Sequence, residues 1–468
     1  MHNHWLVPPT LWGVIGLGVI VAVAIAMPAA AVSLPIPSTK VMLPNGLTVV
    51  VAERHKLPLT TISIRIKAGS AHDPDDQAGL ADLTSRLLDK GSQHRTATEI
   101  AEEIDFLGAQ LSTGAGGTGS TISLALLAKD TERGLALLAD LLQQPQFDAA
   151  ELERERGQML SEIHQRRVDP HQVVFETFRA LFFADHPLQH PVSGYPETVS
   201  RLTRDDVLAF HRRYYVPANA IVVMVGALSE AQMRAWLERY LGGWQATAVA
   251  PVALPQPRPL REKQVRMVDM EVNQTYLQFG LRTVRRADPE FVTLRALNYI
   301  LGGGGFVSRL MRVIREEQGL AYSVGSEVVG LSDSPGYLTA TLETRIETTA
   351  QALTSMFAVL DRLKREPVTA EELADMQQYF IGSLPHRAET YGQVAGLLLD
   401  REFYGLPDGY WATEIEQIQR LTAHDLQQAA QRYLHTEHFV LAVVSRRGQL
   451  DLTHSPIPPD AITYAPPP

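Results

Sequence analysis

Two pairs of segments along the chain repeat the same order of polar and apolar positions. Residues 203–225 (TRDDVLAFHRRYYVPANAIVVMV) match residues 422–444 (TAHDLQQAAQRYLHTEHFVLAVV) at a constant offset of 219 positions. Each pattern predicts an amphipathic helix followed by a buried strand. Upstream, residues 141–153 and 363–374 repeat a helix, a proline and a capped second helix at an offset of 221 to 222. The sequence therefore predicts a tandem duplication of a unit of about 220 residues.

Strand patterns open the first unit. Residues 46–53 (GLTVVVAE) and 60–69 (TTISIRIKAG) alternate in polarity and are expected to pair as a hairpin, and residues 121–128 (TISLALLA) predict a later strand. Helical patterns lie between and after these strands. Strands interrupted by long helices, without strict alternation, indicate an α+β fold. We therefore expect two homologous domains, each a largely antiparallel sheet with helices packed on one face.

Proline-rich stretches suggest where the domains begin and end. SLPIPS, at residues 33–38, is typical of a spacer, and APVALPQPRP, at residues 250–259, is typical of an extended linker. The predicted organisation has five parts: a targeting segment with its spacer (1–39), a first domain (40–249), a linker (250–262), a second domain (263–450) and a tail (451–468).

The first residues of the chain indicate a membrane-targeting segment. No Asp, Glu, Lys or Arg precedes Lys40, an unbroken apolar run extends from Leu11 to Met27, and three small residues follow at 29–31. The run is slightly long for a signal peptide and slightly short for a bilayer span of about 20 residues. A cleaved signal peptide and a retained inner-membrane anchor both stay open, and both predict a periplasmic protein.

Composition narrows the possible chemistry. The 468 residues include 42 Lys and Arg against 52 Asp and Glu, and the resulting charge of −10 disfavours binding to nucleic acid. The chain has no cysteine, which excludes thiolate zinc sites, cysteine nucleophiles and disulfides. Histidine, aspartate and glutamate are the metal ligands that are left.

The most informative helical pattern is GSAHDPDDQAGLADLTSRLLDKGS, residues 69–92. Four leucines recur there at helical spacing: Leu80, Leu83, Leu87 and Leu88. Asp82, Ser85 and Arg86, at positions i, i+3 and i+4, therefore share another face of the same helix.

This stretch resembles the inverted zinc-motif region of the pitrilysin and insulinase-like metallopeptidases, a family that includes the mitochondrial processing peptidases and the cytochrome bc1 core proteins. In that family a strand ending in AGS leads through a loop to a helix of the form GLAHLLEHMLFKGT. This sequence keeps AGS at 68–70, GLA at 79–81 and KGS at 90–92 in register. The resemblance extends over residues 40 to 444.

The catalytic residues of that motif are replaced. In register, the family's first zinc histidine falls on Asp82, its general-base glutamate on Ser85 and its second zinc histidine on Arg86. The family's third ligand, a glutamate, falls on Glu162, which matches. A catalytic zinc needs three protein ligands and an open position for water, so one matching carboxylate does not hold it. We therefore expect no metal or other cofactor in this chain.

Two interpretations of these positions stay open. Asp82 and Arg86 would form a solvated i,i+4 ion pair, which contributes about 0.3–0.5 kcal/mol. Alternatively, Asp82, Glu162 and Asp169 would form a substituted metal site, although an all-carboxylate set suits a harder cation and supplies no placed base.

A glycine run precedes the second informative pattern, residues 301–328 (LGGGGFVSRLMRVIREEQGLAYSVGSEV). Nucleotide binding is a poor explanation, because neither GK[ST] nor GxGxxG spacing is present. The stretch resembles the family's second domain, which carries a glycine-rich turn, an SRL helix start and a GLAYSV strand. The resemblance places the four glycines at the substrate cleft: Gly302, Gly303, Gly304 and Gly305.

The same resemblance gives a role to Arg315 and Tyr322, which lie seven residues apart. They match the arginine and tyrosine that reach over the family's active site and hold the substrate backbone around the scissile carbonyl. Without that role, they would be an exposed helix arginine and a half-buried strand tyrosine.

The resemblance implies a non-catalytic subunit of a pitrilysin-like zinc peptidase. It would act as a heterodimer with a zinc-bearing subunit, bind peptide or unfolded protein and supply Arg315 and Tyr322 in trans. One alternative is a structural subunit like the bc1 core proteins. A second is an autonomous peptidase with an unusual metal site.

The targeting segment predicts the form of the mature protein. Mass spectrometry of the native protein should show a mature start near Val32, or else an intact N-terminus found only in membrane fractions. Intact chain in the soluble cytoplasm would contradict both versions of the export hypothesis.

Overall fold

The computed structural model describes residues 36–245 and 253–465. The predicted targeting segment up to residue 35 and the first residues of the predicted linker lie outside this described part. Within it, no helix is both long and apolar enough to cross a membrane.

The first half of the chain builds a six-stranded sheet in the order β1-β2-β6-β3-β5-β4. Its strands are β1 (Thr39–Met42), β2 (Thr48–Glu53), β3 (Leu59–Ile66), β4 (Gln110–Ala115), β5 (Ser120–Leu127) and β6 (Ala220–Gly226). The helices of this half are α1 (Leu80–Leu87), α2 (Ala97–Leu107), α3 (Thr131–Gln143), α4 (Ala149–Val168), α5 (Pro170–Phe182), α6 (Pro196–Val199), α7 (Arg204–Tyr214) and α8 (Glu230–Leu241).

The second half builds another six-stranded sheet in the order β12-β7-β11-β8-β10-β9. Its strands are β7 (Lys263–Asp269), β8 (Gln274–Arg282), β9 (Ala321–Val329), β10 (Tyr337–Arg345), β11 (Phe439–Ser445) and β12 (Ile462–Ala465). Its helices are α9 (Glu290–Asn298), α10 (Thr349–Arg365), α11 (Ala370–Ser383), α12 (Tyr391–Tyr404), α13 (Tyr410–Arg420) and α14 (Ala423–Tyr433). Both sheets are mixed, because β2 pairs with β6, and β7 with β11 and β12, in parallel. The expected α+β fold of two similar halves is confirmed.

The sequence repeat corresponds to a repeat in structure. In each half a capped helix, α7 or α14, leads to a central strand, β6 or β11, that is buried along its whole length. Thr203 and Thr422 cap the two helices, and each accepts a hydrogen bond from the backbone N–H of an aspartate three residues on. These capping boxes satisfy N–H groups that the helix itself leaves free.

The expected hairpin between the first two strand patterns is wrong. β2 and β3 do not pair, because β6 lies between them, parallel to β2 and antiparallel to β3. β3 instead pairs with β5 on its other side. Strand β6 is more than 150 residues away along the chain, so the local alternation of polarity carried no information about its insertion.

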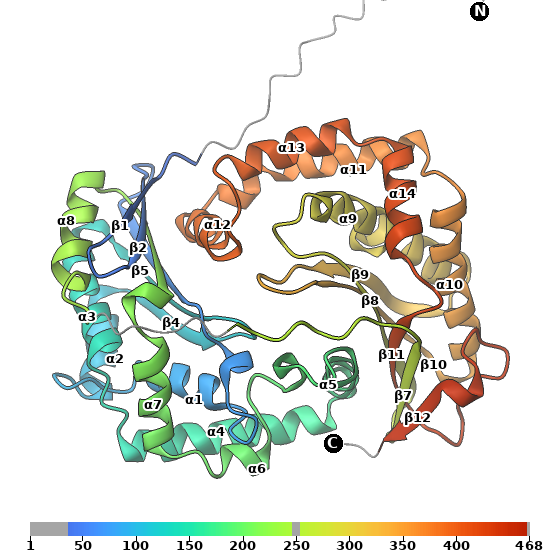
Figure 1. Cartoon of the computed structure of the whole chain (residues 1–468), viewed down its shortest axis with the longest axis horizontal. Helices are drawn as coiled ribbons and strands as arrows, with labels where there is room; N and C mark the ends of the chain where they lie inside the picture. The colour runs from blue at the N-terminus through green and yellow to red at the C-terminus, as the bar shows by residue number, and fades with distance from the viewer. Residues whose placement is uncertain (1–35, 246–252, 466–468) are drawn as a thin grey trace, which may run out of the picture. The chain divides into compact units, whose positions relative to one another are not determined.

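Each sheet is covered on one face by helices of its own half and on the other by a helix from the opposite half (Figure 1). On the first sheet, alternate residues such as Val49 and Val51 face the helices of the first half, whereas Val50 faces α12. Val394 and Leu398 of α12 are buried against that face. The prediction that helices pack on one face of each sheet is therefore correct for the helices of the same half. It did not include the helix from the opposite half that covers the other face. We call these two helices, α5 and α12, the exchanged helices.

The second sheet receives α5 in the same way. Val440 and Val444 of β11 pack against Val174 and Phe178 of α5. At Gly280 on β8, an added Cβ would lie 2.3 Å from the Phe178 ring, so the glycine makes room for the incoming helix. Because each half completes the other's core, we expect the two halves to unfold together.

This exchange predicts a large difference between two phenylalanines on one helix. Phe178 is 1% exposed and Phe175 is 39% exposed. Phe178→Ala should lower the free energy of unfolding by about 3–5 kcal/mol, as is usual for a fully buried phenylalanine, and the matched Phe175→Ala should cost much less. Urea denaturation followed by circular dichroism measures both, and two separate transitions in the unmodified protein would contradict the shared core.

Candidate functional site

Helix α1 carries the residues that stand in the zinc-motif register, and a special loop fixes where it begins. Gly79, the residue before the helix, has φ of 102°, and an added Cβ there would lie 2.9 Å from the Ser193 carbonyl oxygen. The Asp73 carboxylate accepts hydrogen bonds from the backbone N–H groups of Gly79 and Ala81, both at 2.9 Å. The bonds to Asp73 fix the first turn of α1, and the absence of a side chain at Gly79 lets it lie close to the loop around residue 193.

Three of the four predicted motif positions meet between α1 and α4. The Arg86 guanidinium donates from Nη1 and Nη2 to the two carboxylate oxygens of Glu162, at 3.0 and 2.6 Å. Its Nε donates to Oδ2 of Asp82 at 3.1 Å. Arg86 thus makes a two-pronged bond to one carboxylate and a third bond to the other, the geometry that its planar fork favours.

The predicted Asp82–Arg86 ion pair is confirmed, but its expected solvation is wrong. The Asp82 residue is only 8% exposed, and Glu162 completes the group. Burial raises the pKa of Asp82, against the opposing effect of Arg86. The hydrogen bonds from Arg86 hold the pKa of Glu162 below its ordinary value. Burial opposes the charge on Arg86, but its bonds to the two carboxylates still leave its pKa raised.

A catalytic zinc does not fit these side chains. The cation that joins Asp82 to Glu162 is already present as the Arg86 guanidinium, and no histidine belongs to the group. Ser85, at the general-base position, is 1% exposed and has a hydroxyl in place of a carboxylate. A zinc peptidase site needs three metal ligands and a base for the attacking water.

The alternative metal set is not assembled either. Asp169 accepts a hydrogen bond from the His171 backbone N–H at 2.9 Å and caps α5. Over residues 36–245 and 253–465, the structure contains no cluster of three His, Asp or Glu side chains suited to a metal.

Arg315 and Tyr322 come together on the second half. Arg315 lies on a π-helical turn, Met311–Glu317, and Tyr322 lies on the edge strand β9. The Arg315 guanidinium carbon is 5.2 Å from the Tyr322 ring centroid and 5.0 Å from the Phe306 ring centroid. Both contacts are within the range of cation–π attraction.

The three side chains present free polar groups and aromatic surface. Tyr322 is 77% exposed and Phe306 is 63% exposed. Within the described ranges, Arg315 makes no ion pair and the Tyr322 hydroxyl makes no hydrogen bond; the one polar contact of Arg315 is to the Met311 sulfur, at 3.9 Å. We call Phe306, Arg315 and Tyr322 the arginine–aromatic cluster.

The glycine run that precedes this cluster has a packing role in part. An added Cβ on Gly302 would lie 2.5 Å from Ser326 Oγ on β9, and one on Gly303 would lie 2.4 Å from the Asn298 amide. Gly305 has φ of 62°, which favours glycine at the turn before Phe306. Their predicted place at a substrate cleft stays a prediction.

Two contributors to these groups were not predicted from the sequence. Phe306 follows the glycine run directly, and an aromatic residue next to a flexible turn was the available signal. Asp73 lies in the DPDD stretch before α1, where an acidic residue is typical of a helix start. No hydrogen bond or ion pair in the described part of the chain joins the arginine–aromatic cluster to Asp82, Arg86 and Glu162.

Comparison with known proteins agrees with this division into two related halves. Residues 48–195 match the family model described as insulinase (peptidase family M16), and residues 201–380 match the model described as peptidase M16 inactive domain. The chain belongs to the M16 family. The resemblance drawn from the α1 and β9 regions is thereby confirmed.

Similar M16 proteins carry differing descriptions. The Bacillus subtilis protein described as uncharacterized zinc protease YmxG is 27% identical over 408 residues, which cover 87% of this chain and 98% of that protein. The Helicobacter pylori protein described as non-peptidase homolog YmxG is 24% identical over 408 residues, covering 85% of this chain and 92% of that one. A crystal structure of a peptidase M16 inactive domain from Pseudomonas fluorescens has a TM-score of 0.83 and 26% identity, covering 88% and 99%.

The comparisons and the α1 site agree in one respect. The M16 relatives include a protein described as a non-peptidase homologue, and in this chain both zinc histidines and the general base are replaced. Together with the Arg86 guanidinium between the two carboxylates, this supports a non-catalytic member of the M16 family.

The Arg86 group predicts a pH-dependent loss of stability. Arg86→Met leaves the buried Asp82 carboxylate uncompensated and should lower the free energy of unfolding by about 1–3 kcal/mol near pH 8. The folded-state pKa of Asp82 is raised, so its charge penalises folding as pH rises above the unfolded pKa. The pKa of Glu162 is lowered, so its bond to Arg86 is lost only as pH falls below the unfolded pKa of Glu162, and it contributes equally at pH 8 and pH 5. Protonation of Asp82 should therefore be what shrinks the loss at pH 5, measured by urea denaturation.

A double variant separates charge from packing. Asp82→Asn with Arg86→Met removes the buried charge and should recover most of the stability that Arg86→Met alone loses. Equal losses in the single and double variants at both pH values would contradict the proposed charge balance.

Proposed function

We propose that this chain is a non-catalytic M16 subunit, exported to the periplasm, that binds peptide and presents Arg315 and Tyr322 to the active site of a separate zinc-bearing subunit. One contrast carries the proposal. The position of the metal is taken by Arg86, bound to two carboxylates, whereas Arg315 has no ionic partner in the described chain and lies beside an exposed phenol.

The chemistry of peptide hydrolysis gives such a pair a use. A zinc peptidase polarises the scissile carbonyl and then stabilises the negative oxygen of a tetrahedral intermediate. A guanidinium and a phenol are both suitable hydrogen-bond donors for that oxygen or for the neighbouring peptide groups. Neither donor requires a metal in the same chain, so the two functions can be divided between subunits.

Exposure of the arginine–aromatic cluster supports a role in binding. Phe306 and Tyr322 present large aromatic surfaces, and Val307 beside them is 56% exposed. Aromatic residues and arginine are enriched where proteins bind other chains. An extended peptide offers both backbone carbonyls for Arg315 and Tyr322 and side chains for the aromatic surface.

A structural subunit is the competing explanation. Such a subunit would need the helix exchange and the Arg86 group but would give no function to a free guanidinium beside a phenol. The two explanations therefore differ in what happens when Arg315 and Tyr322 are changed within an intact complex.

Activity of the reconstituted complex tests the proposal. Co-expressed with its zinc-bearing partner, this chain should raise peptidase activity well above that of the partner alone. Arg315→Ala or Tyr322→Phe should then lower kcat by about 100-fold if an oxyanion donor is lost. Gel filtration should show that the complex still assembles.

A neighbouring arginine supplies the control. Arg312 lies on the same turn, three residues earlier, and pairs at 3.8 Å with Glu317 and with Glu372. Arg312→Ala should leave kcat within about twofold of the unmodified complex, because a surface ion pair contributes little. An assembled complex whose activity ignores both Arg315→Ala and Tyr322→Phe would favour the structural explanation.

A further inference from the structure

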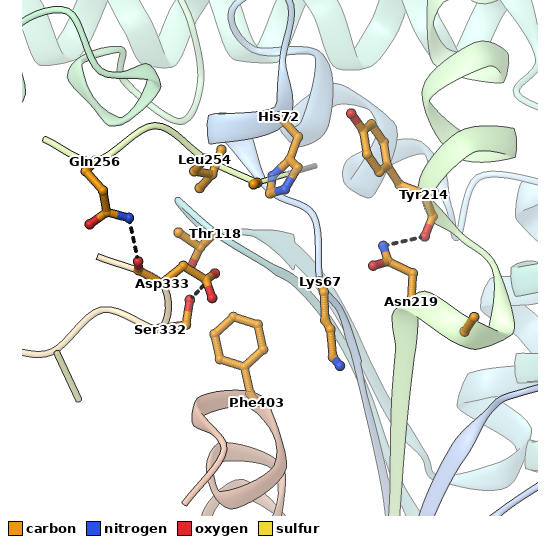
Figure 2. A pocket seen from close by; sticks show the side chains of 12 residues that line it. Lys67, His72, Thr118, Tyr214, Asn219, Leu254, Gln256, Ser332, Asp333 and Phe403 are labelled. Atoms are coloured by element: carbon orange, nitrogen blue, oxygen red, sulfur yellow. Dashed lines mark hydrogen bonds between the residues drawn. The ribbon is translucent and has the colours of Figure 1, made fainter. Parts of the chain in front are cut away.

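A cavity of about 520 Å³ lies between the two halves, away from both groups described above. The first half contributes the end of β3, the loop before α1 and the turn between β4 and β5. The second half contributes the loop between β9 and β10 and the end of α12. Figure 2 shows the lining side chains around this space, with Lys67 and His72 from the first half and Asp333 and Phe403 from the second.

The cavity holds two opposite charges that are not paired with each other. Lys67 is an exposed ammonium that makes no ion pair in the described part of the chain. Asp333 is an exposed carboxylate, and over residues 36–245 and 253–465 the one hydrogen bond that it accepts on its side chain comes from the Ser332 hydroxyl, at 2.9 Å. Gln256 donates to the Asp333 backbone carbonyl at 2.9 Å and holds that loop at the cavity.

His72 adds a hydrogen-bond donor. Its Nδ1 accepts from the Gly69 backbone N–H at 3.3 Å, and its ring packs edge-on against Tyr214 with centroids 5.4 Å apart. Burial lowers the pKa of His72, which favours the neutral ring. With Nδ1 as the acceptor, the proton lies on Nε2, which makes no hydrogen bond to the described chain.

We propose that this cavity binds a zwitterion of the size of an amino acid or dipeptide, with its carboxylate at Lys67 and its ammonium at Asp333. The Phe403 ring, from the second half, supplies aromatic surface for an apolar side chain. Bound in this way, one small molecule contacts both halves of the chain.

Other ligand classes match the lining less well. A phosphate or nucleotide would bring two or more negative charges against one lysine and a carboxylate, and a metal ion would have one carboxylate and a lysine as neighbours. A purely apolar molecule would bury both charges without compensation, which is costly. A zwitterion satisfies each charge with its opposite. This site requires no zinc-bearing partner, so it stands or fails separately from the proposed function.

Calorimetric titration of the full chain with the dipeptide Ala-Phe tests the proposal. Two blocked probes accompany it: N-acetyl-Ala-Phe lacks the ammonium and Ala-Phe amide lacks the carboxylate. Each blocked probe should bind about 10-fold more weakly or worse, because a charge-assisted hydrogen bond is lost. Asp333→Asn and Lys67→Met should weaken Ala-Phe by a similar factor.

Testing each variant with the blocked probes shows which charged end of the dipeptide each residue contacts. Asp333→Asn should cost little further affinity for N-acetyl-Ala-Phe, and Lys67→Met little for Ala-Phe amide, because each contact is already absent. Lys56→Met and Asp76→Asn, at exposed positions outside the cavity lining, should bind Ala-Phe as the unmodified chain does. No binding of Ala-Phe at millimolar concentration, or affinities that ignore the blocked ends and both cavity variants, would overturn the proposal.

Discussion

The exchange of α5 and α12 is the constraint on which the rest of the structure depends. Neither sheet has a complete core from its own half, because the face of β11 is covered by α5 and the face of β6 by α12. The exchange also contributes polar bonds, since the Tyr391 hydroxyl of α12 donates to the Arg54 carbonyl at 2.8 Å. Every group that draws on both halves, including the cavity at Lys67 and Asp333, relies on this shared packing.

The exchange also fixes the place of the helices that carry the positions in the zinc-motif register. Helix α4, which carries Glu162, ends directly at Asp169, and Asp169 caps the exchanged helix α5. Arg86 then joins α1 to α4 through Glu162. A guanidinium with three hydrogen bonds does what a metal would do for the fold, because it compensates the carboxylates and links the two helices. It supplies no open coordination position for a substrate or a water.

The sequence predicted what depends on local pattern. Helix α1 was evident from leucines at helical spacing, and the duplicated units were evident from the matching segments that begin at Thr203 and Thr422. The insertion of β6 between β2 and β3 depends on pairing between distant segments, and local alternation does not encode it. Likewise, the amphipathic pattern of α5 or α12 does not indicate which of the two sheets its apolar face covers.

For the candidate sites too, the sequence predicted which residues are involved but not the contacts that depend on packing. The register of the motif identified Asp82, Arg86 and Glu162 as neighbours, but the fork of Arg86 on Glu162 depends on how α1 packs on α4. The burial of Asp82 depends on the same packing and was not expected from an i,i+4 pair. The contact of Phe306 with Arg315 needs the turn at Gly305, whose conformation is set by the fold.

The zinc content of the purified chain tests whether Arg86 takes the place of the metal. The purified chain is equilibrated with zinc, freed of excess by gel filtration and analysed for metal, beside a variant that carries Asp82→His, Ser85→Glu and Arg86→His. If Arg86 takes the place of the metal, the unmodified protein should hold far less than one zinc per chain. The variant should hold about one, because its two histidines and Glu162 supply three ligands. About one zinc per unmodified chain, together with peptide cleavage that stops when a chelator removes this zinc, would show that Arg86 does not take the place of the metal.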